Sequence, residues 1–283
     1  MVNTGTGTGS AVTPAEGITA GEDDADGLAA AARPGDGPTP RSIDGELPET
    51  TTRLQRAILP TSKRWFGLGR YEVAARYRPA QSGNGVGGDW YDARFGPDGD
   101  AIVAIGDVAG HGPVAAAGMA RIGNALRGLS VTGHPPDSLL GWLNRLICSD
   151  ESPERVASAA VCVFDAGRPA MRWAQAGHLP PVLVSDGTAR LLDRPSGLLL
   201  GTVPTAEYGL AGEELMAGDV LFLYTDGLVE RRDRDIDEGF AALLTAARDW
   251  HGDTAEEAIE MLLTRLDPPV AEDDVCQLAV HIH

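Results

Sequence analysis

The stretch that decides the fold is Ala-Ile-Val-Ala-Ile-Gly-Asp-Val-Ala-Gly-His-Gly-Pro, at residues 101–113. Its first five residues are apolar and predict a strand, and the Gly-rich turn that follows leads into a predicted helix at residues 115–129. Asp107 closes the apolar run, and solvation alone poorly explains an acid in that place. His111 lies four residues beyond Asp107 and could donate a proton to a leaving oxygen. Residues 106–113 therefore form the centre of a candidate site.

The elements around this stretch come in groups of one kind. Strands are expected first, then two helices, then a run of strands, two more helices and a last strand. Strands grouped in runs favour layered α+β architecture over an alternating βαβ sheet. The predicted strands are 71–77, 90–95, 101–105, 156–164, 170–174, 181–184, 220–224 and 275–282, with a hairpin turn at Asp98-Gly99, and the predicted helices are 115–129, 138–147, 240–250 and 255–266.

The chain divides into three parts. Residues 1–45 are rich in Gly, Ala, Thr and Asp and have almost no large apolar side chains, which predicts a disordered tail; a regulatory or partner-binding arm is the alternative. Residues 46–62 predict an amphipathic linker helix, with Leu54, Ile58 and Leu59 at helical spacing and Pro60 at its end. This helix could pack on its own domain or pair with a partner helix. Residues 63–283 are expected to form the main domain.

Charge and composition exclude several classes of protein. The formal net charge is −18, and the basic residues are not clustered, which argues against a nucleic-acid partner. No run approaches the roughly 18 apolar residues of a membrane span, and no signal peptide is recognisable, so we expect a cytoplasmic protein without membrane contact. Cys148, Cys162 and Cys276 are far apart and predict reduced core thiols.

Two short motifs match known signatures in the wrong context. Residues 83–88 fit the dinucleotide pattern G-x-G-x-x-G, but a predicted strand follows where that motif requires a helix. Residues 162–168 have the C-x5-R spacing of a cysteine phosphatase loop, but Asp165 would lie inside the anion cradle and Pro169 follows without a helix. We interpret Cys162 as a core cysteine.

Aspartates recur where predicted strands begin or end. They are Asp89, Asp107, Asp226 and the pair Asp273-Asp274. Each could be a turn or cap residue. If they converge, however, two carboxylates about 4 Å apart repel by roughly 4 kcal/mol at an effective dielectric constant near 20, so the cluster requires a cation. An all-oxygen ligand set favours Mg²⁺ or Mn²⁺, and two such ions can promote displacement at phosphorus.

At this point the chain resembles the metal-dependent PPM phosphatases, specifically the bacterial SpoIIE-like serine phosphatases that regulate sigma-factor partner switching. The resemblance runs from about Leu54 to His281. It rests on six blocks in the family's order, at residues 54–60, 86–92, 106–112, 176–181, 224–230 and 273–275.

The resemblance implies a fold and a set of site residues. The fold is a four-layer α-β-β-α sandwich of two antiparallel sheets flanked by helix pairs. The metal ligands are Asp89, Asp107, Asp226 and Asp273 with the Val108 carbonyl, holding two Mn²⁺ or Mg²⁺ ions. Supporting residues are Asp92, Gly110, His178 and Asp274. The chain departs from the family in Gln175, where Asn is usual, and in Cys276, where Thr is usual.

The resulting hypothesis is a protein serine/threonine phosphatase with His111 as general acid. Its implied substrate is a phosphorylated anti-sigma-factor antagonist of the STAS type, and the linker helix could form a homodimer. Two alternatives stay open: a hydrolase of small phosphate esters or cyclic nucleotides, and a catalytically silent module that binds a phosphoprotein.

Overall fold

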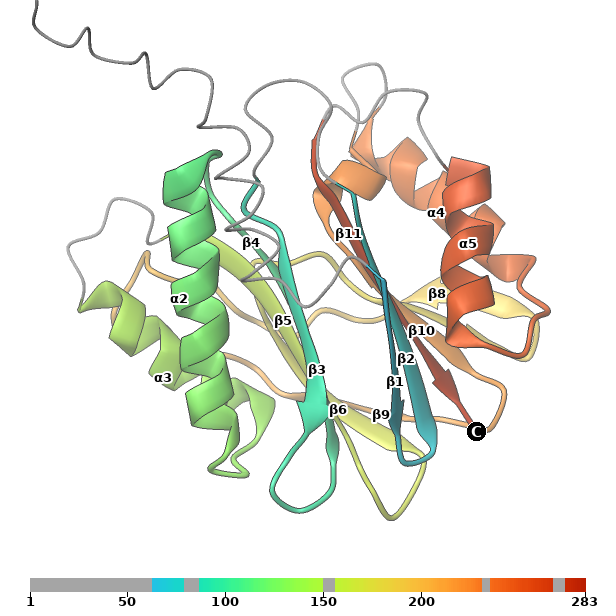
Figure 1. Cartoon of the computed structure of the whole chain (residues 1–283), viewed down its shortest axis with the longest axis horizontal. Helices are drawn as coiled ribbons and strands as arrows, with labels where there is room; N and C mark the ends of the chain where they lie inside the picture. Colours follow the sequence, from blue (N-terminus) through green and yellow to red (C-terminus); the bar gives the residue numbers. More distant parts are fainter. Residues whose placement is uncertain (1–62, 79–86, 150–155, 231–234, 267–272) are drawn as a thin grey trace, which may run out of the picture. The chain divides into compact units, whose positions relative to one another are not determined.

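The computed structural model describes residues 63–78, 87–149, 156–230, 235–266 and 273–283. Within these residues two antiparallel sheets lie face to face, and a pair of helices covers the outer face of each (Figure 1). The predicted four-layer α-β-β-α sandwich is therefore confirmed. The tail predicted at 1–45 and the linker helix predicted at 46–62 lie outside the described residues.

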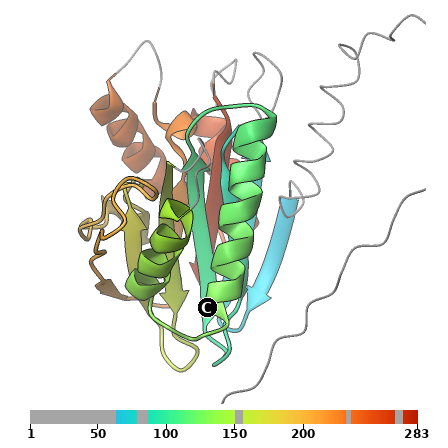
Figure 2. The same cartoon turned by 90° about the vertical axis from the view of Figure 1, so that its left-hand side faces the viewer.

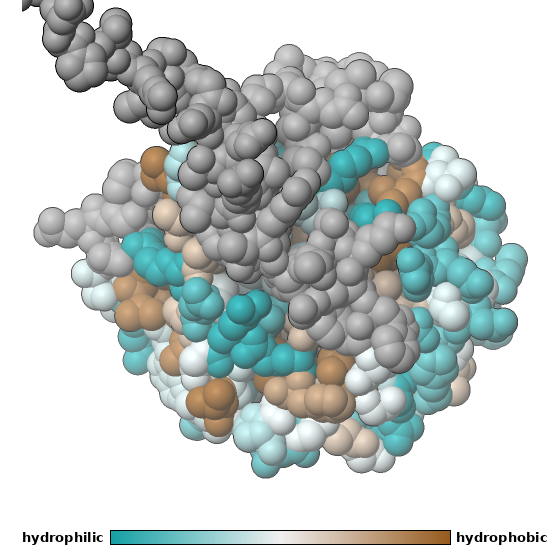
Figure 3. All heavy atoms as spheres, in the orientation of Figure 1, coloured by the Kyte–Doolittle hydropathy of each residue, from teal (hydrophilic) through white to brown (hydrophobic). Residues whose placement is uncertain are grey.

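The first sheet has the strand order β1-β2-β11-β10-β7-β8, and helices α4 and α5 cover its outer face. On the flank occupied by α5, the exposed side chains include Glu256, Glu257 and Glu260, and Figure 3 shows this side as mostly hydrophilic. The elements are β1 (Lys63–Leu68), β2 (Tyr71–Arg78), β7 (Val182–Ser185), β8 (Thr188–Leu191), β10 (Val220–Tyr224), β11 (Val275–Ile282), α4 (Ile236–Arg248) and α5 (Ala255–Leu266).

The second sheet has the strand order β3-β4-β5-β6-β9, and α2 and α3 lie over it (Figure 2). The elements are β3 (Trp90–Phe95), β4 (Ala101–Val108), β5 (Ala157–Phe164), β6 (Ala170–Ala176), β9 (Ala211–Glu214), α2 (Pro113–Ser130) and α3 (Pro136–Cys148). A short 3-10 helix, η2 (Asp226–Leu228), follows β10 in the first sheet.

Burial on both faces explains why the central strands are almost wholly apolar. In β10, Leu221 and Leu223 belong to the core between the sheets, whereas Val220, Phe222 and Tyr224 pack beneath α4 and α5. Because side chains alternate along a strand, one apolar run supplies two hydrophobic cores. None of the helices in the described ranges combines the length and the apolar composition that a membrane crossing requires.

Most element bounds agree with the sequence predictions, and the differences have local causes. Strand β4 continues to Val108, so Asp107 lies inside the strand rather than after it. Helix α4 begins at Ile236, four residues before the predicted start, because the Asp235 side chain caps it by accepting the Asp237 N–H at 3.1 Å. The hairpin turn at Asp98-Gly99 is present, with Gly99 at φ 85°. Strands β1, β8 and β9 were not predicted.

The two rejected motifs have the structures that their rejection required. Strand β3 follows residues 83–88, of which only Gly87 and Gly88 are described. Cys162 is buried within β5, and burial raises the pKa of its thiol. All three cysteines are free, although Cys148 is only partly buried.

Candidate active site

Two pairs of antiparallel strands bring the predicted aspartates together. In the second sheet, the Val108 N–H donates to the Gly88 carbonyl at 3.1 Å, which places Asp89 beside Asp107. In the first sheet, the Thr225 N–H donates to the Cys276 carbonyl at 3.0 Å, which brings Asp226 near the residues that precede β11. Each sheet therefore contributes half of the carboxylate cluster.

Burial and mutual repulsion raise the pKa values of three carboxyl groups. Asp89 is only 3% exposed, and its pKa is raised well above the usual range by burial and then by the charge of Asp107. Burial and the charges of Asp226, Asp273 and Asp274 raise the pKa of Asp107 to about 7. Burial, followed by the charges of Asp273 and Glu230, raises the pKa of Asp226. Buried carboxylates that repel one another destabilise a protein unless a cation neutralises their charge. These oxygen ligands therefore fit a divalent metal centre.

Thr225 connects the two halves of the cluster. Its hydroxyl donates to Asp89 Oδ2 at 2.7 Å and accepts the Cys276 N–H at 2.9 Å. The bond to Asp89 opposes the rise in the pKa of that carboxyl. A side chain of the first sheet therefore orients a carboxylate of the second.

Three glycines allow the chain segments to approach closely. A Cβ on Gly88 would overlap the Val108 carbonyl oxygen and lie 2.6 Å from the Asp107 carboxylate. A Cβ on Gly87 would overlap the Asp274 carboxylate, and one on Gly227 would overlap the Asp274 carbonyl. These positions accept no side chain without a shift of the residues that carry the carboxylates.

The two members of the Asp273-Asp274 pair have different surroundings. Asp274 is buried. The pKa of Tyr77 is raised first by the burial of that tyrosine, and the charge of Asp274 and a hydrogen bond with its side chain raise it further. Asp273 is exposed, accepts the Asp274 N–H at 2.8 Å, and raises the pKa of Asp226 by its charge. Both charges raise the pKa of Asp107, and the assignment of Asp273 as the metal ligand with Asp274 as its support stays a prediction.

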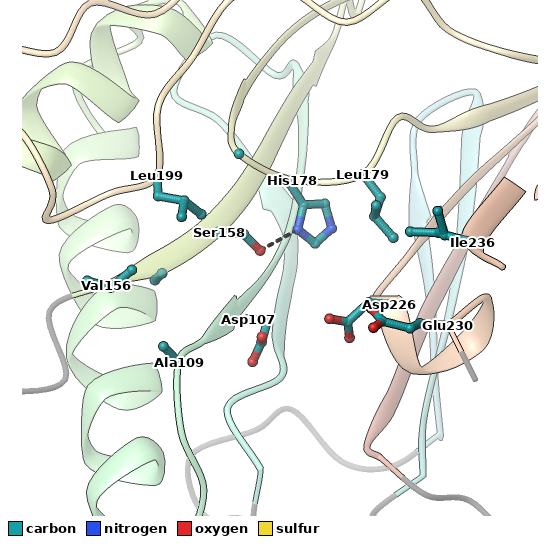
Figure 4. A pocket seen from close by; sticks show the side chains of 12 residues that line it. Asp107, Ala109, Val156, Ser158, His178, Leu179, Leu199, Asp226, Glu230 and Ile236 are labelled. Atoms are coloured by element: carbon teal, nitrogen blue, oxygen red, sulfur yellow. Dashed lines mark hydrogen bonds between the residues drawn. The ribbon is translucent and has the colours of Figure 1, made fainter. Parts of the chain in front are cut away.

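A pocket of about 260 Å³ opens next to the carboxylates. Figure 4 shows Asp226 and Glu230 on one side, near Leu179 and Ile236, with Asp107 and Ser158 facing them. The remaining lining is largely apolar and includes Val156 and Leu199. The pocket thus combines a negative floor with apolar walls.

His178 lies in this pocket as a neutral imidazole. Ser158 Oγ and His178 Nδ1 share a hydrogen bond of 2.7 Å, and the backbone N–H of His178 donates to Gln175 Oε1 at 2.9 Å. Burial lowers the pKa of His178 to about 4, partly offset by the backbone of Tyr224. Since Ser158 of β5 is the register partner of Asp107, its bond to His178 places the imidazole beside the strand next to the one that carries Asp107. Gln175, a departure from the family pattern, holds this histidine in place.

Other predicted site residues have varied positions. His111 is exposed between Gly110 and Gly112, whose φ angles are 105° and 85°, and it does not line the described pocket. Its catalytic role and the supporting role of Gly110 stay predictions. The Val108 carbonyl faces Gly88 at the edge of the cluster.

Asp92 is engaged away from the carboxylate cluster. It forms ion pairs with Arg94 in its own strand and with Arg127 of α2, at 3.1 Å in the second case. This residue therefore fastens β3 to α2. The supporting role of Asp92 in the site stays a prediction.

The sequence analysis did not predict three residues of the site. Thr225 precedes Asp226 in the block at residues 224–230, and Ser158 is polar among small apolar residues, so each had a weak local signal. Glu230 lines the pocket and belongs to the same block as Asp226. Their roles depend on partners far away in the sequence, which no local pattern reveals.

Comparison with known proteins identifies relatives in sequence and in structure. The sequence profile of the family described as Stage II sporulation protein E (SpoIIE) matches residues 97–283. The phosphoserine phosphatase RsbU of Bacillus subtilis is 30% identical over 197 residues, which cover 68% of this chain and 56% of RsbU. The chain thus spans little more than half the length of that relative.

Two solved structures share the fold. The RsbU and RsbW domains of Rv1364c from Mycobacterium tuberculosis match with a TM-score of 0.68 and 30% identity, over 75% of this chain and 61% of that one. The PP2C phosphatase domain of SpoIIE from Bacillus subtilis, solved with a fragment of its regulatory domain, matches with a TM-score of 0.63 and 19% identity, over 75% and 64%. The predicted family resemblance is confirmed, and the chain belongs to the SpoIIE family.

Proposed function

We propose that this protein hydrolyses phosphoserine or phosphothreonine in a protein substrate and needs Mn²⁺ or Mg²⁺ to do so. The observation that carries the proposal is the convergence of Asp89, Asp107, Asp226 and Asp273 at one end of the two sheets, with raised pKa values in three of them. The carboxylates and the Val108 carbonyl would hold the ions. When bound, two divalent ions supply Lewis acidity toward the phosphoryl group and activate water for in-line attack.

The protein's own residues would orient the ligands and the substrate. Thr225 holds Asp89 through its hydroxyl, and Gly88 lets β3 and β4 approach at their ends. The neutral imidazole of His178 offers a hydrogen-bonding group inside the pocket without adding charge. His111, exposed on the turn after β4, is the proposed donor of a proton to the serine oxygen.

The pocket walls favour a protein substrate over a small phosphate ester. Val156, Leu179, Leu199 and Ile236 offer apolar surface next to the carboxylates, which suits the residues that flank a phosphoserine. The relative RsbU is a phosphoserine phosphatase. The proposed substrate is a phosphorylated anti-sigma-factor antagonist of the STAS type. A cytoplasmic site of action and a homodimer through residues 46–62 stay predictions.

The decisive experiment measures phosphate release from a phosphorylated STAS protein in the presence of Mn²⁺. Asp226→Asn should lower kcat/KM about 100-fold or more, which corresponds to a loss of about 3 kcal/mol of transition-state stabilisation. Glu256→Gln, a change in an exposed carboxylate on α5, is the matched control and should keep wild-type turnover. Wild-type turnover in Asp226→Asn would refute the proposal.

The same assay separates the alternatives. A hydrolase of small esters would cleave p-nitrophenyl phosphate or a cyclic nucleotide faster than the phosphoprotein. A silent binding module would release no phosphate and would give no heat on calorimetric titration with Mn²⁺. The proposed phosphatase should bind Mn²⁺ and prefer the phosphoprotein.

A further inference from the structure

A second group of metal-ligating side chains lies at the other end of the first sheet. The antiparallel register of β2 and β11 places His281 opposite Glu72. His283 follows two residues later and lies on the same side, since side chains alternate along an extended chain. The candidate ligand atoms of these three residues all lie within 4.8 Å of one another. Figure 1 marks this end of the chain with the letter C.

The group is far from the aspartates. Asp274 precedes β11, and His281 is seven residues further along the same chain. At about 3.3 Å per residue, the two positions are separated by roughly 23 Å. The two groups therefore cannot share an ion.

Neighbouring elements hold these side chains in place. The N–H of Ala255, the first residue of α5, donates to Glu72 Oε1 at 3.0 Å, which leaves Oε2 to face His283 Nε2 at 3.2 Å. The rings of His281 and His283 meet edge to face with centroids 4.6 Å apart, and Trp250 packs edge-on against His281. The bond from Ala255 comes from outside the group, and hydrogen bonds of that kind orient the ligands of metal sites.

One nitrogen in the group is not satisfied by the protein. Glu72 and His281 are each only 7% exposed, and His281 Nδ1 is buried without a hydrogen-bond partner among the described residues. Burying a polar atom without a partner destabilises a folded protein, so such atoms call for an explanation. A simple ion pair between His283 and Glu72 leaves the buried position of His281 unexplained.

We infer that Glu72, His281 and His283 form a metal site, separate from the aspartates, that takes Zn²⁺. Two imidazoles and one carboxylate are ligands that Zn²⁺ prefers, whereas Mg²⁺ and Mn²⁺ favour oxygen donors. Three protein ligands leave one position for water. The ion would fasten the end of β11 to β2 and, through Ala255, to the start of α5.

Calorimetric titration of the metal-depleted full chain with Zn²⁺, in excess Mg²⁺ to occupy the aspartates, tests this site. Wild type should bind one Zn²⁺, and the melting temperature should rise with the Zn²⁺ concentration. His283→Gln and Glu72→Gln should each weaken binding by at least about 10- to 100-fold, the loss that follows removal of a group that only hydrogen-bonds a metal ligand. Of these, His283→Gln changes an exposed residue, so loss of folding does not obscure the result.

His251→Gln is the matched control, because His251 is an exposed histidine between α4 and α5 that is not in the group. It should bind Zn²⁺ as wild type does. Wild-type affinity in both His283→Gln and Glu72→Gln would overturn the inference. So would binding that Asp226→Asn abolishes, since the ion would then belong to the aspartates.

Discussion

Asp107→Asn should stabilise the metal-free protein at pH 8 and, at the same time, abolish its proposed activity. Asp107 lies near the end of β4 among carboxylates from both sheets, and burial and the charge of Asp226 are the main reasons why its pKa is raised to about 7. An amide in its place keeps the size of the side chain and removes the charge. The variant would then lack both the repulsion and the metal ligand.

The magnitude follows from the pKa difference. The ordinary pKa of this carboxyl is 3.8, so the folded protein raises it by about three units, each worth about 1.4 kcal/mol. The folded state binds this proton more tightly than the unfolded state does. The resulting stability is therefore complete below pH 3.8 and is lost as the pH rises through about 7. Above pH 7 the loss reaches about 4 kcal/mol, and Asp107→Asn should recover about 2–4 kcal/mol of it.

Urea denaturation in the presence of EDTA measures this gain. At pH 8 the midpoint for Asp107→Asn should lie above that of wild type with an unchanged m-value, and the difference should shrink toward pH 4. Asp98→Asn, a change in the exposed turn between β3 and β4, should show no such pH-dependent gain. If Asp107→Asn is no more stable than wild type at pH 8, the carboxylates do not repel one another as the structure indicates.

Two substitutions test the supports of the cluster. Thr225→Val should cost about 1–3 kcal/mol of unfolding free energy and weaken Mn²⁺ binding, because it removes the hydroxyl that donates to Asp89; Thr225→Ser should restore both, and an unaffected Thr225→Val in urea denaturation and calorimetry would contradict this role. Gly88→Ala should cost about 1–3 kcal/mol and lower phosphatase activity, because its Cβ would overlap the Val108 carbonyl; a wild-type melting temperature would show that β3 and β4 can separate freely.

Local patterns were enough for the elements that carry a strong periodic signal. Helix α5 and strand β11 have the predicted bounds, because each presents a continuous apolar face to a core. Strands β8 and β9 are short and have no buried residues, and they form by pairing at the edges of the sheets. Nothing in four residues without a buried apolar face predicts which strand they will pair with.

The candidate site was predictable as a set of residue types but not as an arrangement. Aspartates beside apolar runs indicated a metal centre, and four of them do converge. Thr225 and Ser158 could not be predicted in the same way, since each acquires its role from a partner on another segment, Asp89 and His178. Asp92 belongs to one of the sequence blocks of the site, yet its partners are Arg94 and Arg127. The sequence alone did not reveal this pairing.

The register between neighbouring strands determines whether the acidic side chains meet in this site. A slip of one residue between β3 and β4 would turn the side chains of one strand to its other face, and Asp107 would leave the cluster. The Val108 N–H bond to the Gly88 carbonyl and the close approach at Gly88 oppose such a slip. The cores on both sides of the sheets must therefore provide the free energy that holds mutually repelling carboxylates together. Since that repulsion destabilises the metal-free protein, a bound cation should stabilise the fold and complete the site in the same event.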